Sequence, residues 1–142
     1  MNQSDGAASG ADLTLSLLGA AQAVEARIEA SLSPLDLSLA KLNVLGILVG
    51  SSTPLTLGEL AQQLACVRSN VTQLVDRLES DGLVRREPDP ADRRSIRAVV
   101  TDTGRERQHA GSLALARVQD DVTQVLTGFD SAHIEQALSA LK

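Results

Sequence analysis

Apolar residues recur at steps of three and four along most of the chain. Such steps predict helices, because these positions share one face at 3.6 residues per turn. The expected helices span 12–31, 39–50, 57–65, 69–81, 102–126 and a last segment after Asp130. Residues 1–11 are mostly Gly, Ala, Ser and Asp, and are expected to form a flexible tail.

Short polar side chains and Pro or Gly mark where these helices begin and end. Pro34 ends the first helix, because proline disfavours helical geometry in the residue before it. Ser38 is placed to cap the second helix, and Thr56 with Glu59 has the spacing of a capping box. Gly82 ends the fourth helix by taking the left-handed conformation. Later helix starts are expected at Thr101 or Asp102 and at Asp130.

The period changes between the fourth and fifth helices. Residues 83–87 and 95–101 read as short strands, and the Pro- and Asp-rich segment 88–94 reads as the turn that joins them. Three helices followed by this hairpin, over residues 36–101, have the order of a winged helix-turn-helix. We therefore expect a mainly α fold with a small β-hairpin wing.

The outer helices are amphipathic, yet a central domain of about 65 residues leaves little surface to cover them. Pairing residues 12–33 and 102–142 with the same helices of a second copy would bury those faces. The winged helix-turn-helix is then flanked by N- and C-terminal dimerisation helices. The alternative is that the outer helices fold back on their own chain.

Composition excludes several classes of protein. One Cys rules out an intrachain disulfide framework and a cysteine-built zinc site, and one aromatic residue rules out base stacking on single strands. His109 and His133 stand alone, so no metal or other cofactor is predicted. Motifs of nucleophile elbows and phosphate loops are missing, which argues against an enzyme. Neither a signal peptide nor a membrane span is indicated, so a cytoplasmic protein is expected.

The net charge of −5 argues at first against nucleic acid as a partner, but the charge is unevenly distributed. Residues 68–97 hold seven of the 13 basic residues, all Arg, against six acids. Residues 1–67 and 98–142 carry the negative balance. Arg is suited to bidentate contacts with phosphate and guanine, so the Arg-rich third is a candidate DNA-binding surface.

Two elements carry the candidate DNA contacts. The helix at 68–80 should bury an apolar face and present polar side chains to the major groove. Its candidates are Arg68, Ser69, Asn70, Thr72, Gln73 and Arg77. The wing, suited to phosphate or to a narrow minor groove, offers Asp92, Arg93, Arg94 and Arg97. Asp92 is expected to bond an Arg and fix its direction.

Three segments are informative when taken together: LSLAKLNVLGIL (37–48), PLTLGELAQQL (54–64) and VRSNVTQLVDRLESDGLVRREPDPADRRSIRAVVTDTG (67–104). In this order they resemble the MarR (multiple antibiotic resistance regulator) family of winged helix-turn-helix transcriptional regulators. FDSAHIEQALSAL (129–141) is similar to the family's final helix. The resemblance implies a bacterial homodimeric repressor of a pseudo-palindromic operator, released by a small ligand or by thiol oxidation. It also implies that 68–80 is the recognition helix and that Asp92 and Arg94 are wing residues.

One departure from the family concerns the start of the recognition helix. The family commonly has Leu-Ser where this chain has Cys66-Val67. Val67 has no capping oxygen, so either Ser69 caps one turn later or the helix end is frayed. Which polar residue meets which base therefore stays open.

The effector site is the least defined part of the sequence. Arg27, Arg105 and Arg107 are candidates to hold an anionic small molecule between the outer helices and the winged domain. Cys66 is either a redox switch or a small core residue, the commoner role of a buried Cys.

Two functions remain to be separated. The first is a homodimeric, sequence-specific regulator that binds double-stranded DNA. The second is a winged-helix protein–protein interaction module or anti-repressor without DNA binding, which the acidic total and the missing cap at Val67 favour.

Overall fold

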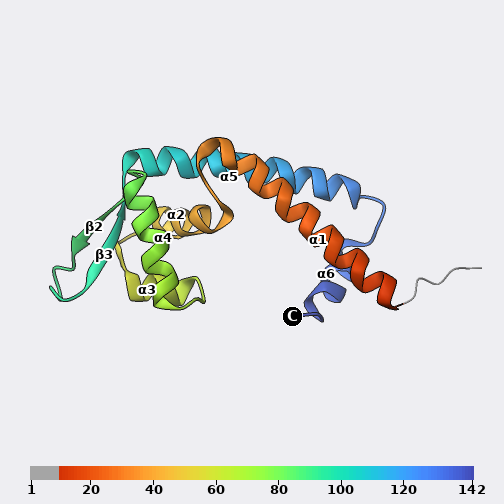
Figure 1. Cartoon of the computed structure of the whole chain (residues 1–142), viewed down its shortest axis with the longest axis horizontal. Coiled ribbons are helices and arrows are strands. Elements are labelled where there is room, and N and C mark those ends of the chain that lie inside the picture. Colours follow the sequence, from red (N-terminus) through yellow and green to blue (C-terminus); the bar gives the residue numbers. More distant parts are fainter. Residues whose placement is uncertain (1–9) are drawn as a thin grey trace, which may run out of the picture.

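A computed structural model describes residues 10–142 (Figure 1). In chain order the elements are α1 (Gly10–Leu32), the 3₁₀ turn η1 (Ser33–Leu35), α2 (Leu39–Gly50), β1 (Leu55–Thr56), α3 (Leu57–Gln63), α4 (Arg68–Ser80), β2 (Val84–Pro88), β3 (Ile96–Val100), α5 (Asp102–Val125) and α6 (Ser131–Ser139). The mainly α fold with a small β wing is confirmed. Of the expected tail at 1–11, residues 1–9 lie outside the described part, whereas 10 and 11 belong to α1.

The predicted helix caps are present. Ser38 accepts a hydrogen bond from the backbone N–H of Lys41 at 3.2 Å, and Thr56 with Glu59 forms a complete capping box. The backbone N–H and the hydroxyl of Thr56 both donate to the Glu59 carboxylate, which lowers the pKa of Glu59. The Thr101 side chain caps α5 by accepting from the backbone N–H of Gly104, and the Asp130 side chain caps α6 by accepting from the backbone N–H groups of Ala132 and His133. These local side-chain bonds explain why four helix starts, those of α2, α3, α5 and α6, lie where the sequence pattern predicts them.

The predicted hairpin forms the antiparallel pair β2–β3, in which Val84 lies opposite Val100. The sheet also has a third strand that the sequence pattern did not reveal. The two residues of β1 pair with the other edge of β3, with Leu55 opposite Ala98, and give the order β1-β3-β2. Two residues are too few for an alternating pattern, so only the long-range pairing defines this strand.

A single buried cluster joins α2, α3, α4 and the sheet. Its fully buried large side chains are Leu32, Leu45, Leu60, Leu78, Leu83, Val44, Val71, Val75 and Val84. Leu32, the last residue of α1, is the point at which the first outer helix enters this core. The helix-turn-helix and the wing therefore form one packed unit.

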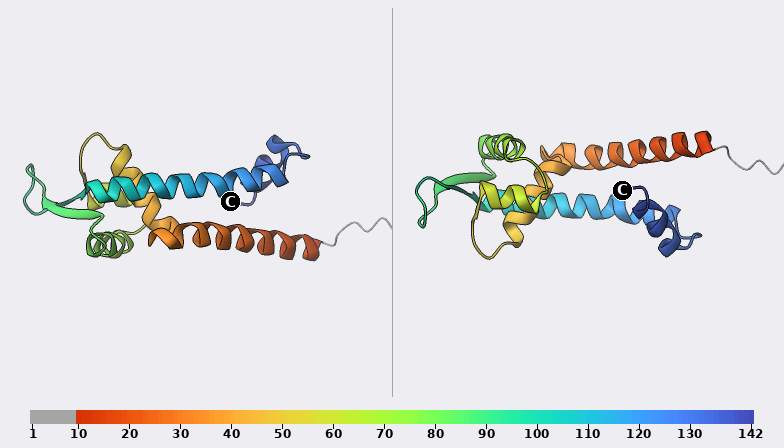
Figure 2. Two further views of the ribbon diagram at one scale, coloured as in Figure 1. Left: turned by 90° about the horizontal axis from the view of Figure 1, so that it is seen from above. Right: turned by 90° about the horizontal axis from the view of Figure 1, so that it is seen from below.

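The outer helices extend away from this packed unit (Figures 1 and 2). Figure 2 shows α1 and most of α5 running outward together, with the β2–β3 tip at the opposite end of the molecule. Large apolar side chains of these helices stay exposed: Leu13, Leu15, Leu17, Leu18, Leu113, Val125, Phe129, Leu138 and Leu141. Within residues 10–142, the outer helices thus leave many of their large apolar residues uncovered by their own chain.

Within residues 10–142, no single helix is long and apolar enough to cross a membrane. Only α1 and α2 together reach that length and composition, as a pair bent by 67°.

Candidate nucleic-acid interface

Helix α4 is anchored in the core by one face and exposes the other. Val71, Val75 and Leu78 are buried at helical spacing. The opposite face presents Arg68, Ser69, Asn70, Gln73 and Arg77, all exposed, with Thr72 half-buried between them. All six residues predicted for a DNA-reading helix therefore lie on the solvent side of α4.

Helix α4 begins without the side-chain cap that Ser69 was expected to supply. Val67 is the N-cap residue in extended conformation, it is 62% exposed, and its side chain makes no capping bond. Ser69 lies inside the first turn, so the expectation that it caps the helix one turn later is wrong. The Thr72 hydroxyl also turns inward and donates to the carbonyl of Arg68 at 3.0 Å. Its methyl group is the part of Thr72 left to contact a base.

The wing tip is organised by two aspartates. Asp89 accepts from the backbone N–H of Ala91, and Asp92 accepts from the backbone N–H of Arg94, both at 3.0 Å. These bonds are the usual way in which Asp stabilises a turn. Asp92 does bond an Arg, and it does so through the backbone N–H of Arg94. The side chains of Arg93 and Arg94 consequently extend from a fixed turn into solvent.

Acidic side chains near α4 and the wing are largely committed to internal bonds. Arg86 on β2 pairs with Asp76 and with Glu79, at 3.5 Å for Glu79. On the outer face of the hairpin, Glu87 lies 2.8 Å from the Nε of Arg85 and 3.8 Å from Arg97. Arg97, predicted as a wing contact, is therefore a partly buried sheet residue with a carboxylate partner.

Arg86 was not among the predicted site residues, although it connects the two predicted DNA-contacting elements. Its guanidinium also reaches the carbonyl of Thr72 at 3.5 Å. Sequence spacing gave no sign of this role, because ten residues separate Arg86 from Asp76 and the bond forms only when β2 folds back along α4.

Four arginines remain available for a partner. Among residues 10–142, no carboxylate lies within 4.0 Å of Arg68, Arg77, Arg93 or Arg94. All four are exposed, two on α4 and two on the wing tip. Asp76, Glu79 and Glu87 are thus paired with other arginines of the same chain. The four arginines form an accessible, positively charged surface on a chain of net negative charge.

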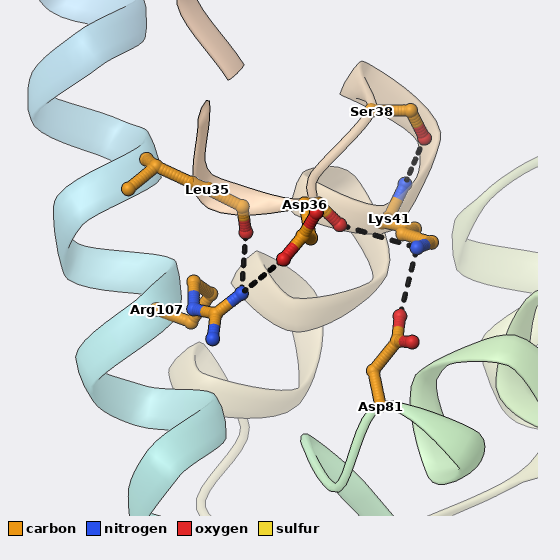
Figure 3. A network of polar contacts seen from close by, with 6 residues as sticks. All are labelled: Leu35, Asp36, Ser38, Lys41, Asp81 and Arg107. Atoms are coloured by element: carbon orange, nitrogen blue, oxygen red, sulfur yellow. Dashed lines mark hydrogen bonds and ion pairs between the residues drawn. The ribbon is translucent and has the colours of Figure 1, made fainter. Parts of the chain in front are cut away.

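The predicted effector arginines do not converge. Arg27 lines a hollow between α1 and α5 beside Val118 and Asp121. Arg107 lies 11 residues before Val118 on α5, or roughly 16 Å along the helix axis. It donates to the carbonyl of Leu35 and lies 3.9 Å from Asp36 (Figure 3). Arg105 is exposed and belongs to neither group. Within one chain the three arginines therefore do not line a common hollow, and an anion site that uses all of them stays a prediction.

Cys66 is half-buried and packs against the core cluster. Its backbone N–H donates to the carbonyl of Ala61 at 3.2 Å. This placement favours the interpretation that Cys66 is a small residue packed against the core, and not a redox switch. In the part of the chain that the structure describes, no group of three His, Cys, Asp or Glu residues could hold a metal ion.

Comparison with known proteins finds transcriptional regulators with similar sequences. Residues 35–95 match the MarR family model. The HTH-type transcriptional regulator YkoM of Bacillus subtilis is 43% identical over 53 residues, which are 37% of this chain and 34% of YkoM. The chain matches 34% to 44% of the length of three curated relatives.

Solved structures extend the similarity to the outer helices. A cysteine-to-serine mutant of MarR from E. coli, complexed with operator DNA, has a TM-score of 0.76 at 27% identity, covering 91% of this chain and 92% of that one. The transcriptional repressor CouR, known from Rhodococcus jostii RHA1, was solved on a 23-mer DNA duplex; it has a TM-score of 0.73 at 27% identity and covers 91% and 89%. These relatives are transcriptional regulators rather than enzymes. Residues 35–95 thus match the MarR family model, and over about nine-tenths of its length the chain has a fold similar to that of MarR from E. coli.

Proposed function

We propose that this protein is a homodimeric repressor that binds double-stranded DNA at a pseudo-palindromic operator. The observation that carries the proposal is the set of four exposed arginines without carboxylate partners in the described residues, two on α4 and two on the wing. Helix α4 supplies the length and polar face to enter a major groove, and the wing reaches the flanking backbone or minor groove.

The proposed contacts divide into two kinds. Asn70 and Gln73 have amide groups that can bond base edges, and Ser69 has a hydroxyl for a base or phosphate. The four arginines supply phosphate or guanine contacts, which strengthen binding at low salt. Sequence-specific binding then rests on few groups, because the rest of the chain carries negative charge that DNA repels.

Dimerisation is proposed from the outer helices. Their exposed apolar residues lie on α1, on the outer half of α5 and beyond it around α6. A two-fold dimer pairs the same surface on both copies, so this one apolar region can bury itself. Two copies of α4 would then present themselves to two half-sites about one helical turn apart on one face of the duplex.

A small-molecule effector is proposed for a cavity of about 480 Å³ between α2, α3 and α5. Leu42, Ile47, Leu64 and Leu115 form its apolar part. Asn43, Gln63, Gln108 and Ser112 supply neutral polar groups. A lining without charged side chains suits an uncharged aliphatic molecule better than an anion. CouR, a similar structure, was solved with p-coumaroyl-CoA, so a ligand response has a parallel in the fold.

Selection of genomic fragments by the purified full chain tests the proposal. Fragments that share an inverted repeat, each half protected in a footprint, are the expected result. Equal recovery of all fragments, with no salt-dependent affinity for random duplex, would favour the protein–protein module instead.

A further inference from the structure

A polar network joins the end of the candidate recognition helix to the turn between α1 and α2. Lys41 on α2 lies at its centre, and its Nζ donates to Oδ2 of Asp81 at 2.8 Å and to the carbonyl of Asp36 at 3.2 Å (Figure 3). Asp81 is the C-cap residue of α4. One side chain therefore connects the end of α4 with the chain segment that leaves α1.

The turn at Asp36 is held from a second side by α5. Arg107 donates to the carbonyl of Leu35 and lies 3.9 Å from the Asp36 carboxylate (Figure 3). Asp36 itself has φ +53°, a left-handed conformation that L residues other than Gly rarely adopt and that Asn and Asp tolerate best. Side chains from α2 and α5 thus fix the backbone of a turn whose conformation is unfavourable without support.

A third bond links the body of α1 to the same region. The carboxylate of Glu29 accepts from the backbone N–H of Leu39, the first residue of α2, at 3.2 Å. With Lys41 and Arg107, this bond connects α1 and α5 to the start of α2 and the end of α4. All three of these connections involve residues 29–41, which comprise the end of α1, the connecting segment 33–38 and the start of α2.

The two central ion-pairing groups are partly shielded from water. The side chains of Lys41 and Asp81 are 20% and 35% exposed. Partial burial reduces screening by salt and holds the two groups in one geometry, so this pair constrains position more than a fully exposed pair does.

We infer that Lys41 and Asp81 are positioning residues that set the angle of α4 relative to the outer helices, and through it the half-site separation that the protein accepts. The inference rests on the proposed dimer, in which α1 and α5 face the second copy. In that dimer, rotation of the packed helix-turn-helix and wing relative to α1 and α5 changes the distance between the two recognition helices. Lys41 opposes this rotation, because it bonds both Asp81 at the end of α4 and the carbonyl of Asp36 in the turn after α1.

The test uses the full chain and duplexes that carry the selected half-site as inverted repeats. Centre-to-centre separations are varied one base pair at a time, and affinity is measured by anisotropy. Lys41→Met removes both bonds of Lys41, and Asp81→Asn removes the charge of Asp81 while keeping its shape. Lys41→Arg preserves a cation at the site. Arg117→Met is the matched control for charge, because Arg117 is exposed on α5 and has no ion pair within residues 10–142.

We expect the wild type to prefer its best separation by about tenfold over its neighbours one base pair away. Lys41→Met and Asp81→Asn should reduce that preference to about threefold or less, while Lys41→Arg and Arg117→Met keep it. Urea midpoints confirm that each variant is folded. A preference unchanged in both Lys41→Met and Asp81→Asn overturns the inference alone. A wild type that binds no inverted repeat better than random duplex overturns the proposed function as well.

Discussion

Arg86 on β2 and Glu79 on α4 are bonded twice. The Nη1 atom of Arg86 lies 3.5 Å from Oε2 of Glu79, and the backbone N–H of Arg86 donates to Oε1 at 3.1 Å. Because Asp76 also pairs with this guanidinium, one arginine joins two turns of the recognition helix to the first strand of the wing. The two candidate DNA-contacting elements, α4 and the wing, are therefore positioned as a unit.

Arg86→Met should weaken that unit while keeping the aliphatic stem of the side chain. Asp76 and Glu79 are 52% and 41% exposed, so both can return to water, and we expect a loss of about 1 kcal/mol in the free energy of unfolding. Operator affinity should fall further than in Arg85→Met, which removes the same charge from the neighbouring strand position. Urea unfolding and anisotropy measure both effects. Equal affinities of the two variants would show that Arg86 contributes only charge.

Arg94→Ala tests the wing. The side chain extends from the turn that Asp92 fixes, so its loss should leave the fold unchanged and remove one contact with the DNA backbone or minor groove. Affinity should fall about tenfold, and the slope of log K against log salt should decrease by about one. Titration at several salt concentrations measures both, with Arg117→Ala as the control. If Arg94→Ala binds like the wild type, the wing does not contact DNA.

Val67→Ser should stabilise the protein. Val67 is 62% exposed and supplies no capping oxygen, so replacing it sacrifices little buried area and adds a cap to α4. The expected gain is about 0.5–1 kcal/mol in the free energy of unfolding. Val67→Ala, which removes the side chain without adding an oxygen, is the control in a urea titration. A serine variant no more stable than the alanine variant would mean that the start of α4 is held by other contacts.

Gly104→Ala should lower the free energy of unfolding, whereas an ordinary Gly-to-Ala replacement in a helix raises it. A Cβ at Gly104 would come within 2.0 Å of the carbonyl oxygen of Leu83, which is backbone and cannot rotate away. We expect a loss of roughly 1–3 kcal/mol or more. Gly46→Ala on α2, where a Cβ meets nothing within 4 Å, should instead gain up to about 1 kcal/mol. Thermal unfolding of both variants checks the pair; two stabilised variants would contradict the close approach of α5 to Leu83.

Local chemistry accounts for the parts of the fold that the sequence predicted. Ser38, the Thr56–Glu59 pair and Asp130 satisfy N–H groups within four residues of themselves, so their role is visible in a short window. The role of Gly82 is also visible in a short window, because Gly82 comes directly after the C-cap of α4 and adopts a left-handed conformation with φ +73°. The polar face of α4 was predictable because its buried face repeats at helical spacing.

Long-range contacts account for the failures. β1 exists only because Leu55 and Thr56 pair with Ala98 and Arg97, more than 40 residues away. The bonds of Arg86 and Arg107 also depend on distant elements, and sequence spacing does not show which Arg each neighbouring acid pairs with. In the structure, some arginines of the cluster are ion-paired within the chain, whereas others are exposed and are candidates for DNA contact. Only the tertiary structure shows which arginine belongs to which group.

One titration tests the central claim most directly. A labelled duplex carrying the selected inverted repeat is titrated with the full chain, at two salt concentrations, beside a duplex with one half-site scrambled. We predict saturation at two chains per intact duplex, with affinity that falls steeply as salt rises and falls again when one half-site is lost. Binding of equal strength to intact and scrambled duplexes, without dependence on salt, would contradict a dimer that reads DNA through α4 and the wing.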